Sequence, residues 1–404
     1  MKLEPNLRSA WWAVVARFLV HGLAISTWVS RIPSIKSSLH LNDGMFGLAL
    51  LGSAVGSMIG IPVCGYVVSH YGSRRAATFT SSALCVALVL PAVAFNAWTL
   101  FAGLFVFGFM AGSNDVAMNS QGVAIERLMG APTMSRFHAM FSIGGIVGAA
   151  IGGVIASQGI SPQIHLPVAG ALILAFAMAT GPYLMETSPD AKTPSIRPRL
   201  HHIPPALLVL SAIGFCIFLS EGAIADWTAI YLRQVLSAGP GLAAAGYAVF
   251  SGTMSVFRLL GDSISARLGA AWTIRGGAAL AAIGLGSALL VHSPYAALPG
   301  IALTGIGYSS IIPLVFAGGG KVKHVGEGAG VATVSGLGYI GFLVGPPAIG
   351  FLSQMTTLRI GLAFVVFLSA LAASLVSVVE RYEEQAALAE DELKPRPASS
   401  PSLP

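Results

Sequence analysis

The chain has 404 residues, of which 55% are hydrophobic and only 9% are charged, with a formal net charge of +6. A soluble globular domain carries about 25% charged residues, so this composition excludes a water-facing surface over most of the chain. The basic residues stand singly between apolar runs and form no patch, so we expect no nucleic-acid partner.

Twelve apolar runs follow one another along the chain. They span residues 10–32, 44–67, 76–95, 98–125, 137–158, 165–185, 205–231, 240–261, 271–292, 295–318, 328–353 and 358–379. Each is close to the roughly 20 residues that a transmembrane helix needs, and all are too long and too apolar for the alternating strands of a barrel. We therefore predict an all-α membrane protein with twelve transmembrane helices.

The distribution of Lys and Arg predicts the orientation of these spans. With the N-terminus placed in the cytoplasm, 16 of the 22 basic residues fall in cytoplasmic segments, 4 on the opposite side and 2 within spans. This bias predicts that both termini are cytoplasmic. The first run is too long for a signal peptide, so we interpret it as a retained span of a multi-pass protein of the inner (plasma) membrane.

The two halves of the chain repeat each other at an offset close to 197 residues. The matches are 24–28 with 223–227, Gly65 with Gly261, Gly72 with Gly269, Gly148 with Gly345, and Gly153 with Gly350. They predict two pseudo-symmetric six-helix bundles. We expect an N-terminal bundle at 1–185, a cytoplasmic linker at 186–204, a C-terminal bundle at 205–380 and a disordered cytoplasmic tail at 381–404.

Three acidic residues lie well inside predicted spans, where an ionisable group is costly and by default indicates function. Asp115 lies in the fourth span, on one helical face with Asn119 and three glycines, Gly108, Gly112 and Gly122. This face predicts a helix that borders a cavity. The alternative for Asp115 is a structural hydrogen bond to a neighbouring helix.

The other two acids lie in the seventh span. Glu221 is near its middle, and Asp226 is further out on a different face, because five residues turn a helix by about 500°. We interpret Glu221 as a cavity residue. Asp226 could cap the helix, pair with Arg233 or belong to an outer gate.

Five residues of the first span share one face by their spacing: Arg17, His21, Ala24, Trp28 and Arg31. Arg17, His21 and Trp28 are candidate substrate contacts. Arg17 could be a counter-ion for an anion or for a buried acid, or it could extend its charge to the membrane interface. Trp28 and its repeat partner Trp227 are either interfacial anchors or a symmetric pair beside the substrate.

Three further polar rings lie within the spans. His138, at the start of the fifth span, could titrate in the cellular pH range or form a gate hydrogen bond. Tyr308 and Tyr339, in the tenth and eleventh spans, could donate to a substrate or pack in the core. The cysteines fall inside apolar runs without metal-ligand spacing, so we predict no metal and no cofactor.

The loop after the second span, 65–75, carries Gly65, Gly72, Arg74 and Arg75. It resembles the signature between helices 2 and 3 of the major facilitator superfamily, although Ser69 stands at the usual aspartate. The second half repeats this pattern as Arg258, Gly261, Asp262, Arg267 and Gly269. The resemblance implies that these residues form a cytoplasmic gate, in which Arg258 and Asp262 can pair at i,i+4 spacing.

Longer stretches are similar to the fucose-permease-like and uncharacterised inner-membrane branch of this superfamily. They are 28–33, 112–119, 138–144, 221–227 and 338–347. In the sugar/proton symporters of this branch, helix 4 carries a Glu and, four residues later, an Asn; Asp115 and Asn119 occupy these places. The acid of their first helix is missing, with Val29 nearest to its position. In the fifth span, 148–153 resembles the drug/proton antiporter motif with Ala149 in place of its Pro, which argues against efflux.

We therefore predict a secondary active transporter that moves a small polar, possibly sugar-like, solute by alternating access. Asp115 and Glu221 are the predicted proton carriers, and sodium is compatible with the sequence as an alternative coupling ion. We expect a monomer with a small-molecule substrate, a proton and the lipid bilayer as partners. The alternatives are proton-coupled efflux of amphipathic compounds and a membrane sensor or scaffold that transports nothing. No nucleophile–base or metal constellation indicates an enzyme.

Overall fold

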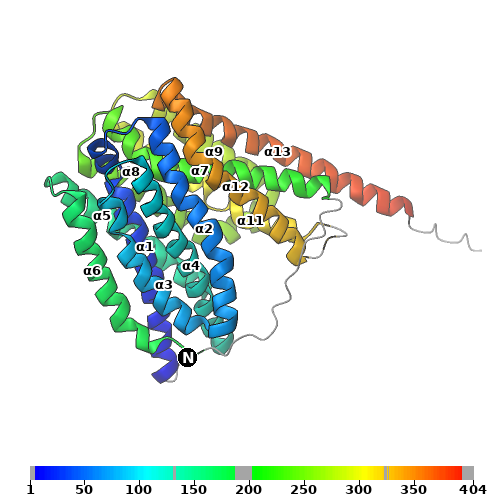
Figure 1. Ribbon diagram of the computed structural model, residues 1–404. Helices are drawn as coiled ribbons and strands as arrows, with labels where there is room; N and C mark the ends of the chain where they lie inside the picture. Colours follow the sequence, from blue (N-terminus) through cyan, green and yellow to red (C-terminus); the bar gives the residue numbers. More distant parts are fainter. Residues whose placement is uncertain (1–4, 131–132, 187–202, 323–324, 326, 394–404) are drawn as a thin grey trace, which may run out of the picture.

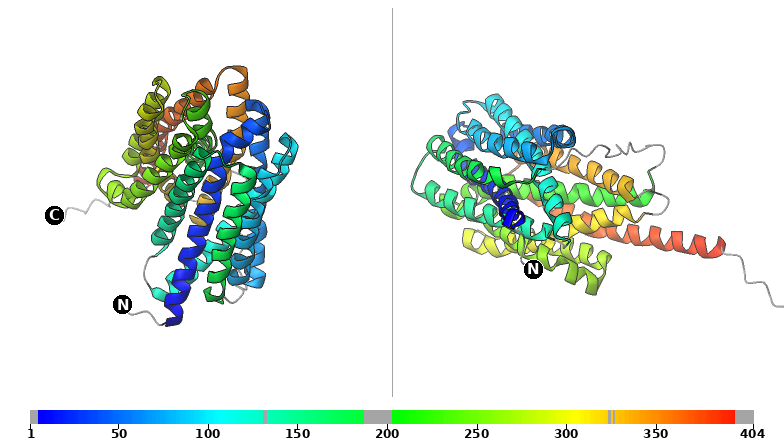
Figure 2. Two further views of the ribbon diagram at one scale, coloured as in Figure 1. Left: turned by 90° about the vertical axis from the view of Figure 1, so that its left-hand side faces the viewer. Right: turned by 90° about the horizontal axis from the view of Figure 1, so that it is seen from below.

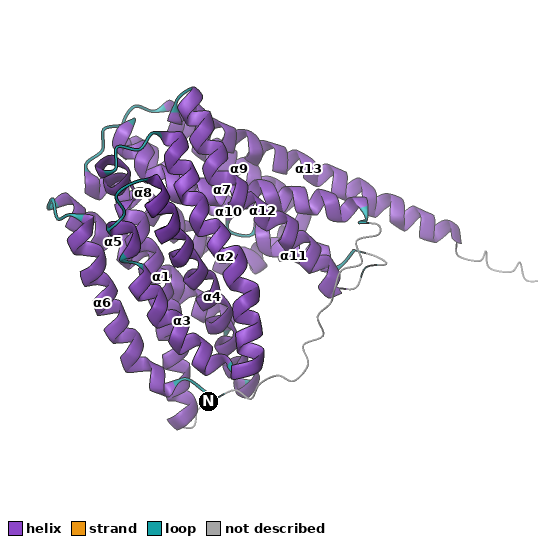
Figure 3. Cartoon of the chain, in the orientation of Figure 1, coloured by secondary structure: helices purple, strands orange, loops and turns teal. Residues whose placement is uncertain are grey.

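The computed structural model describes residues 5–130, 133–186, 203–322, 325 and 327–393. This part of the chain contains helices joined by short turns and has no strands (Figure 3). Twelve of its helical segments are long and apolar enough to cross a membrane. The predicted fold class, an all-α membrane protein with twelve transmembrane helices, is confirmed.

Six long helices and two short 3₁₀ turns make up the first half (Figure 1). They are α1 (Pro5–Ser38), α2 (Asp43–Tyr71), α3 (Ser73–Ala87), η1 (Leu90–Ala92), α4 (Ala97–Met129), α5 (Met134–Ser157), α6 (Pro162–Thr180) and η2 (Gly181–Tyr183). Asn96 begins α4 with a capping box: its side chain accepts from Thr99 N at 2.9 Å, and Thr99 Oγ1 accepts from Asn96 N at 3.1 Å. Two otherwise unpaired N–H groups are satisfied in this way.

Seven helices make up the second half, because one of its spans is broken. They are α7 (Pro205–Gln234), α8 (Pro240–Leu268), α9 (Ala270–Leu290), α10 (Pro294–Tyr308), α11 (Ile311–Gly320), α12 (Glu327–Met355) and α13 (Leu358–Leu393). Helices α10 and α11 together form the span Pro294–Gly320. The predicted linker lies mostly outside the described residues, as do residues 394–404.

Residues 381–393, which the sequence assigned to a disordered tail, continue α13 as a helix. The segment is rich in Ala, Glu, Leu and Gln, which are strong helix formers. The acidic composition of this segment therefore does not prevent helix formation.

The repeat is visible in the backbone at the turn between the second and third helix of each half. Gly72 joins α2 to α3 with φ 82° and ψ 153°, and Gly269 joins α8 to α9 with φ 81° and ψ 155°. Residues with a Cβ rarely adopt this positive φ. The paired glycines of the sequence are therefore required by one tight turn that is used twice.

The two bundles meet at one end of the molecule. We call the side where α1 begins the terminal side and the side where α1 ends the far side. Helix α2 packs on α12, and α5 packs on α8. These contacts are close on the far side: a Cβ on Gly47 would lie 3.1 Å from Gly350 Cα, and one on Gly153 would lie 3.1 Å from Ala244 Cβ.

On the terminal side the bundles diverge (Figures 1 and 2). The apolar cluster nearest to that side includes Val14, Phe18, Ile125 and Phe137, and every residue that it contains belongs to the first half. The larger core cluster contains residues from both halves. The bundles are therefore packed against each other on the far side and separated on the terminal side.

Candidate functional site

Asp115 lies near the middle of α4, and its side chain is exposed. A carboxylate that faced lipid at this depth would be costly, so the exposed side of Asp115 indicates the space between the bundles. Asn119, one turn along α4, donates from Nδ2 to Asp115 Oδ1 at 3.2 Å and to the Asp115 carbonyl at 2.8 Å. The structure thus brings together the acid and the amide that the sequence placed on one face.

The glycines of α4 do not line this space. A Cβ on Gly112 would lie 2.8 Å from the Ser57 carbonyl oxygen and 2.9 Å from Ser57 Cα, and Gly108 approaches Ser53 in the same manner. Ser57 also donates from Oγ to the Gly108 carbonyl at 2.9 Å. For the glycines the prediction of a cavity-facing stripe is wrong: Gly108 and Gly112 allow the backbones of α2 and α4 to approach closely, as small residues do between membrane helices, and Gly122 faces Met134 and Phe137 of α5.

Glu221 on α7 faces Arg258 on α8. Arg258 Nη2 lies 4.0 Å from Glu221 Oε1, and the side chains are 43% and 14% exposed respectively. Glu221 Oε1 is buried and forms no hydrogen bond with a described residue. The ion pair is therefore loose. Arg258 was expected to pair with Asp262, but among the described residues its ion pair is with Glu221.

The break between α10 and α11 holds Arg258 in place. Pro313, in the first turn of α11, has no N–H group, so it cannot donate to the carbonyl of Ser309 four residues earlier, and its ring clashes with that carbonyl in a regular helix. The freed Ser309 carbonyl accepts a hydrogen bond from Arg258 Nε at 3.0 Å. The position of a proline in one span thus determines the position of a charge on another.

Tyr339 on α12 interacts electrostatically with one acid of each bundle. Its ring is 38% exposed, and it lies close enough to both Asp115 and Glu221 to interact with each electrostatically. One face of the ring stacks on Phe218 at 4.7 Å between centroids, and Phe342 also contacts Phe218 at 4.8 Å. Two carboxyl groups and an aromatic platform therefore border the same space.

His138 on α5 is exposed and lies within electrostatic range of Arg258 on the other bundle. It also contacts Phe18 edge to face at 5.1 Å. Its neighbour on the other side is His21, with which it also interacts electrostatically. His138 thus connects the polar interior of the first bundle with the ion pair of the second.

His21 belongs to a buried network, not to the open space. Asn114 Nδ2 lies 3.0 Å from His21 Nδ1, and Asn114 Oδ1 accepts from Ser81 Oγ at 2.6 Å and from Thr80 Oγ1 at 3.1 Å. All four side chains are buried. The assignment of His21 as a substrate contact is not supported in this conformation, because Asn114 and the neighbouring aromatic side chains enclose it.

The arginines of α1 stabilise helix ends. Arg17 is fully buried and donates to the Ala177 carbonyl at 2.7 Å, in the last turn of α6. Arg31 is also buried and donates to the Ile160 carbonyl at 2.5 Å, just beyond the end of α5. Cations are favourable at helix C-termini. Arg17 therefore faces α6 and does not contact the acids of the site.

Three aromatic residues proposed as substrate contacts are enclosed by protein. Trp28 is 4% exposed, and Trp227 is fully buried and packs edge to face on Phe46 of the other bundle at 5.7 Å. The tryptophans are therefore not interfacial anchors. Tyr308 is also fully buried, and its hydroxyl lies 2.6 Å from Ser369 Oγ on α13. It supports the core behind Glu221, with which it interacts electrostatically.

The two gate motifs lie on the terminal side. Arg74 pairs with Glu186 and donates to the Pro182 carbonyl at 3.1 Å, so it ties α3 to the end of its own bundle. The remaining motif residues of both halves lie beside the two glycine turns, and most are exposed: Gly65, Arg75, Asp262 and Arg267. In this conformation the motif contacts described here lie within a bundle, which agrees with the separation of the bundles on this side.

Asp226 is partly buried and forms no hydrogen bond or ion pair with a described residue. Arg233, its proposed partner, donates instead to the Ala238 carbonyl at 2.8 Å. Tyr247 on α8 lies within electrostatic range of both Asp226 and Glu221. The space between α7 and α8 therefore holds a second acid, further from the terminal side than the first.

The sequence did not identify Asn114, Pro313, Phe218 or Tyr247. Asn114 could have been identified, because it is a polar residue in the middle of an apolar span, but the adjacent Asp115 is the more costly group there and was chosen instead. Pro313 could also have been identified, because a proline within a span frees a carbonyl four residues earlier. Phe218 and Tyr247 had no signal, since aromatic residues are common in any apolar span. Among the described residues, no three His, Cys, Asp or Glu side chains gather as a metal site would require.

Two bundles of membrane helices around a space with charged walls define a membrane transporter, and comparisons with known proteins agree. Residues 14–324 match the family model described as Major Facilitator Superfamily. The chain is 34% identical to an uncharacterised MFS-type transporter of Yersinia pestis, over 90% of this chain and 94% of the relative. It is 30% identical to membrane protein MosC of Rhizobium meliloti, over 90% and 88%. The chain belongs to the major facilitator superfamily.

Solved structures share the fold. A mutant of the nucleoside transporter NupG superposes with a TM-score of 0.76 at 11% identity, over 92% of this chain and 99% of that one. A bacterial homologue of the human lysosomal transporter Spinster, in an inward-facing and unoccupied conformation, superposes with a TM-score of 0.73 at 14% identity, over 94% and 98%. At these identities the likeness shows the fold alone.

Proposed function

We propose that the chain is a proton-coupled secondary transporter of a small polar organic solute and that Asp115 and Glu221 carry the proton. The observation behind this proposal is that one acid from each bundle borders the same open space, with Tyr339 in electrostatic range of both. A carboxyl group removed from bulk water favours its neutral form, and access of water favours the charged form. Alternating access would expose these groups to each side of the membrane in turn.

The polar and aromatic lining supports the solute class. Asp115 and Asn119 offer hydrogen-bond acceptors and donors, and the exposed ring of Tyr339 offers a flat apolar surface. A ring-shaped solute with several hydroxyl groups, such as a sugar, matches both features. We place the protein as a monomer in the plasma membrane with both termini in the cytoplasm. The terminal side, where the bundles diverge, then faces the cytoplasm, so this conformation is the inward-facing one.

Efflux of amphipathic compounds is the second candidate. The cluster of Phe218, Phe316 and Phe342 on α7, α11 and α12 favours it, because such a lining binds apolar ligands. The exposed acid–amide pair on α4 favours the polar solute. The proposal of a sensor or scaffold that transports nothing has less support, because the family to which the chain belongs consists of transporters.

The first experiment identifies the solute. Purified protein is screened by thermal shift against sugars, organic acids and toxic amphipathic compounds, and the compounds that stabilise it are tested for uptake into proteoliposomes. We expect polyhydroxylated solutes to stabilise the protein by mass action. Stabilisation by amphipathic cations alone would favour the efflux candidate.

The second experiment tests the acids. In proteoliposomes, Asp115→Asn and Glu221→Gln should abolish uptake driven by a proton gradient, because neither amide can release a proton. The matched control is Glu380→Gln, which removes an acid of α13 that is paired with Arg275 of α9 and should leave the uptake unchanged. Proton-driven uptake and counterflow that both remain unchanged in Asp115→Asn would show that this assignment is wrong.

A further inference from the structure

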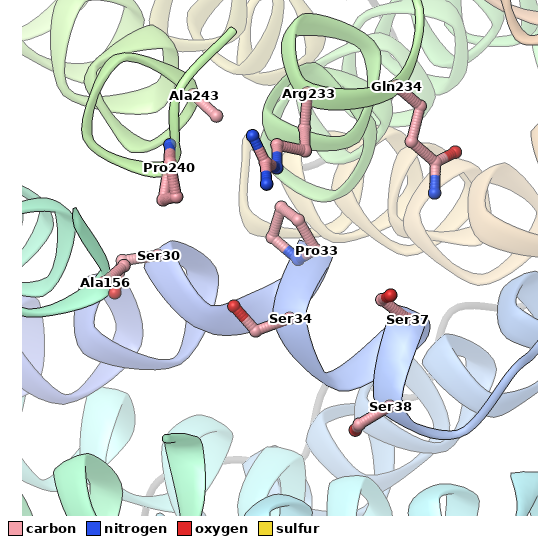
Figure 4. Close-up of a pocket in the computed structure, with 10 residues that line it drawn as sticks. All are labelled: Ser30, Pro33, Ser34, Ser37, Ser38, Ala156, Arg233, Gln234, Pro240 and Ala243. Carbon is pink, nitrogen blue, oxygen red and sulfur yellow. The ribbon is translucent and has the colours of Figure 1, made fainter. Parts of the chain in front are cut away.

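A pocket of about 570 Å³ lies between the bundles on the far side, apart from the space that contains Asp115 and Glu221. It is bordered by the end of α1, the end of α7 and the start of α8 (Figure 4). Four serines of α1 contribute to its wall: Ser30, Ser34, Ser37 and Ser38. Its volume falls within the range of about 300–1,000 Å³ that is usual for small-molecule sites.

Arg233 provides the charge of this pocket. In Figure 4 its side chain extends from α7 towards α1, on the side where Pro33 and Ser34 lie. The guanidinium donates from Nη1 to the Ala238 carbonyl at 2.8 Å and forms no ion pair with an acid among the described residues. Its other donors are therefore free to bind an anion, which a guanidinium does with good geometry.

The serines supply hydroxyl groups opposite this charge. Ser30 and Ser38 donate to carbonyls of their own helix, Thr27 and Ile35. The hydroxyl groups of Ser34 and Ser37 form no hydrogen bond with a described residue, and Figure 4 shows both serines on the α1 wall of the pocket, across from the helix that carries Arg233. Two free hydroxyl groups beside a free guanidinium form a wall that can hydrogen-bond a polyhydroxylated anion.

The surrounding charges leave the pocket positive. No acid lines the pocket among the described residues, and Asp43, which follows α1 in the chain, is paired with Lys36 at 2.5 Å. Lys36 also donates to Gln234 of the pocket wall at 3.3 Å. Pro240, the first residue of α8, also lines the pocket, and a helix begins with the positive end of its dipole. A neutral solute would not need these charges.

We propose that this pocket binds a small, hydroxyl-bearing carboxylate as it enters or leaves the central space. The proposal refines the solute class of the proposed function and rests on it only for the claim that the ligand is transported. The phosphate of an anionic lipid has the same charge and could reach the same group, so the experiment distinguishes a soluble ligand from a lipid headgroup.

The test uses the full chain with Ser34→Cys as a reporter. The natural cysteines Cys64, Cys85 and Cys216 are buried, so they add little background. The rate of labelling by an anionic methanethiosulfonate is compared with the rate for a cationic one, in nanodiscs of neutral phosphatidylcholine. The ratio of the anionic to the cationic labelling rate should be roughly tenfold higher than for a free thiol, because one nearby positive charge attracts one reagent and repels the other.

Variants of Arg233 test the source of this preference. Arg233→Gln in the reporter background should remove most of it, and Arg233→Lys should retain it. Arg359→Gln is the matched control, because it removes an arginine at the start of α13 that does not line the pocket. A preference that Arg233→Gln leaves unchanged, or that Arg359→Gln removes equally, would overturn the proposal.

Protection identifies the ligand. Glucuronate should slow the labelling of the Ser34→Cys variant at least threefold more than glucose at equal concentration, because a hydrogen bond between two charged groups strengthens binding by at least this factor. Arg233→Gln should abolish the difference between the two compounds. Equal effects of the two compounds would overturn the choice of a carboxylate. Protection by phosphatidylglycerol in the nanodisc, without protection by glucuronate, would assign the pocket to a lipid. Asp115→Asn should not alter the labelling, so failure of proton coupling and failure of this site are separate results.

Discussion

Replacing Pro313 by Ala tests whether the break between α10 and α11 positions the charge of Arg258. Alanine restores the N–H group that can donate to Ser309 O within a continuous helix. That carbonyl now accepts from Arg258 Nε at 3.0 Å. The variant should therefore straighten the span and release Arg258 from its anchor.

The magnitude follows from the geometry of Arg258. A hydrogen bond to a charged group contributes about 1.5–3 kcal/mol. Solvent screening of this side chain, which is 43% exposed, lowers the expected contribution to about 1–2 kcal/mol. The ion pair with Glu221 is long, at 4.0 Å, so its contribution to stability should be nearly the same in the natural protein and in the Pro313→Ala variant. Arg258→Gln should thus destabilise the natural protein by about 1–2 kcal/mol more than it destabilises the Pro313→Ala variant.

The assay is a double-mutant cycle on the free energy of unfolding in mixed micelles. The control is Pro299→Ala, because Pro299 also lies inside a helix of this span, α10. The carbonyl that Pro299 leaves free is that of residue 295, whereas Arg258 donates to the carbonyl of Ser309. The cycle with Pro299→Ala should give no coupling. Additive effects of Pro313→Ala and Arg258→Gln, within about 0.5 kcal/mol, would refute the reasoning.

Three further predictions concern the scaffold. Gly112→Ala should destabilise the protein by about 1–3 kcal/mol, because its Cβ would lie 2.8 Å from the Ser57 carbonyl oxygen. Gly65→Ala should not, because no atom lies within 4 Å of its Cβ. Equal unfolding free energies of the two variants would contradict the assignment of Gly112 to helix packing. Asn114→Ala should cost about 1–3 kcal/mol in the same assay, because it leaves the buried partners of Asn114 unpaired; an unchanged stability would mean that they find other partners. Lys36→Met should separate the bundles on the far side, because it removes the hydrogen bond from Lys36 to Gln234 of the other bundle. Distances between spin labels placed on the two bundles at this side should lengthen. An unchanged distribution of these distances would show that Lys36 does not hold the bundles together.

The sequence predicted the fold well because the bilayer restricts the possibilities. Twelve apolar runs can satisfy their backbone groups in lipid only as helices, and the ends of most runs coincide with those of the spans to within a few residues. The repeat was predictable for a related reason. Gly72 and Gly269 stand at turns of positive φ, which residues with a Cβ rarely adopt, so the same residue type marks both copies.

The site was less predictable because spacing along a helix defines a face but not its neighbour. The stripe on α1 does share one face, yet Arg17 and Arg31 face the ends of α6 and α5. Gly108 and Gly112 of α4 likewise face α2. Asp115 and Glu221 were found because a buried charge is costly in any packing arrangement. The functional roles given to all these residues remain predictions.

The placement of the arginines also determines which cation can respond to movement of the bundles. Arg17 and Arg31 are fixed by carbonyls within the first bundle, and a rigid-body rotation of the bundles does not change those contacts. Arg258 is half exposed, lies at the loose distance of 4.0 Å from Glu221, and has His138 of the other bundle within electrostatic range. Because α5 and α8 meet across the interface, rotation must change the separation of His138 and Arg258. The pair of Arg258 with Glu221 lies within the second bundle and keeps its length in such a rotation. The electrostatic environment of Arg258 nevertheless depends on the relative position of the bundles through His138, and the proposed proton coupling needs a dependence of this kind.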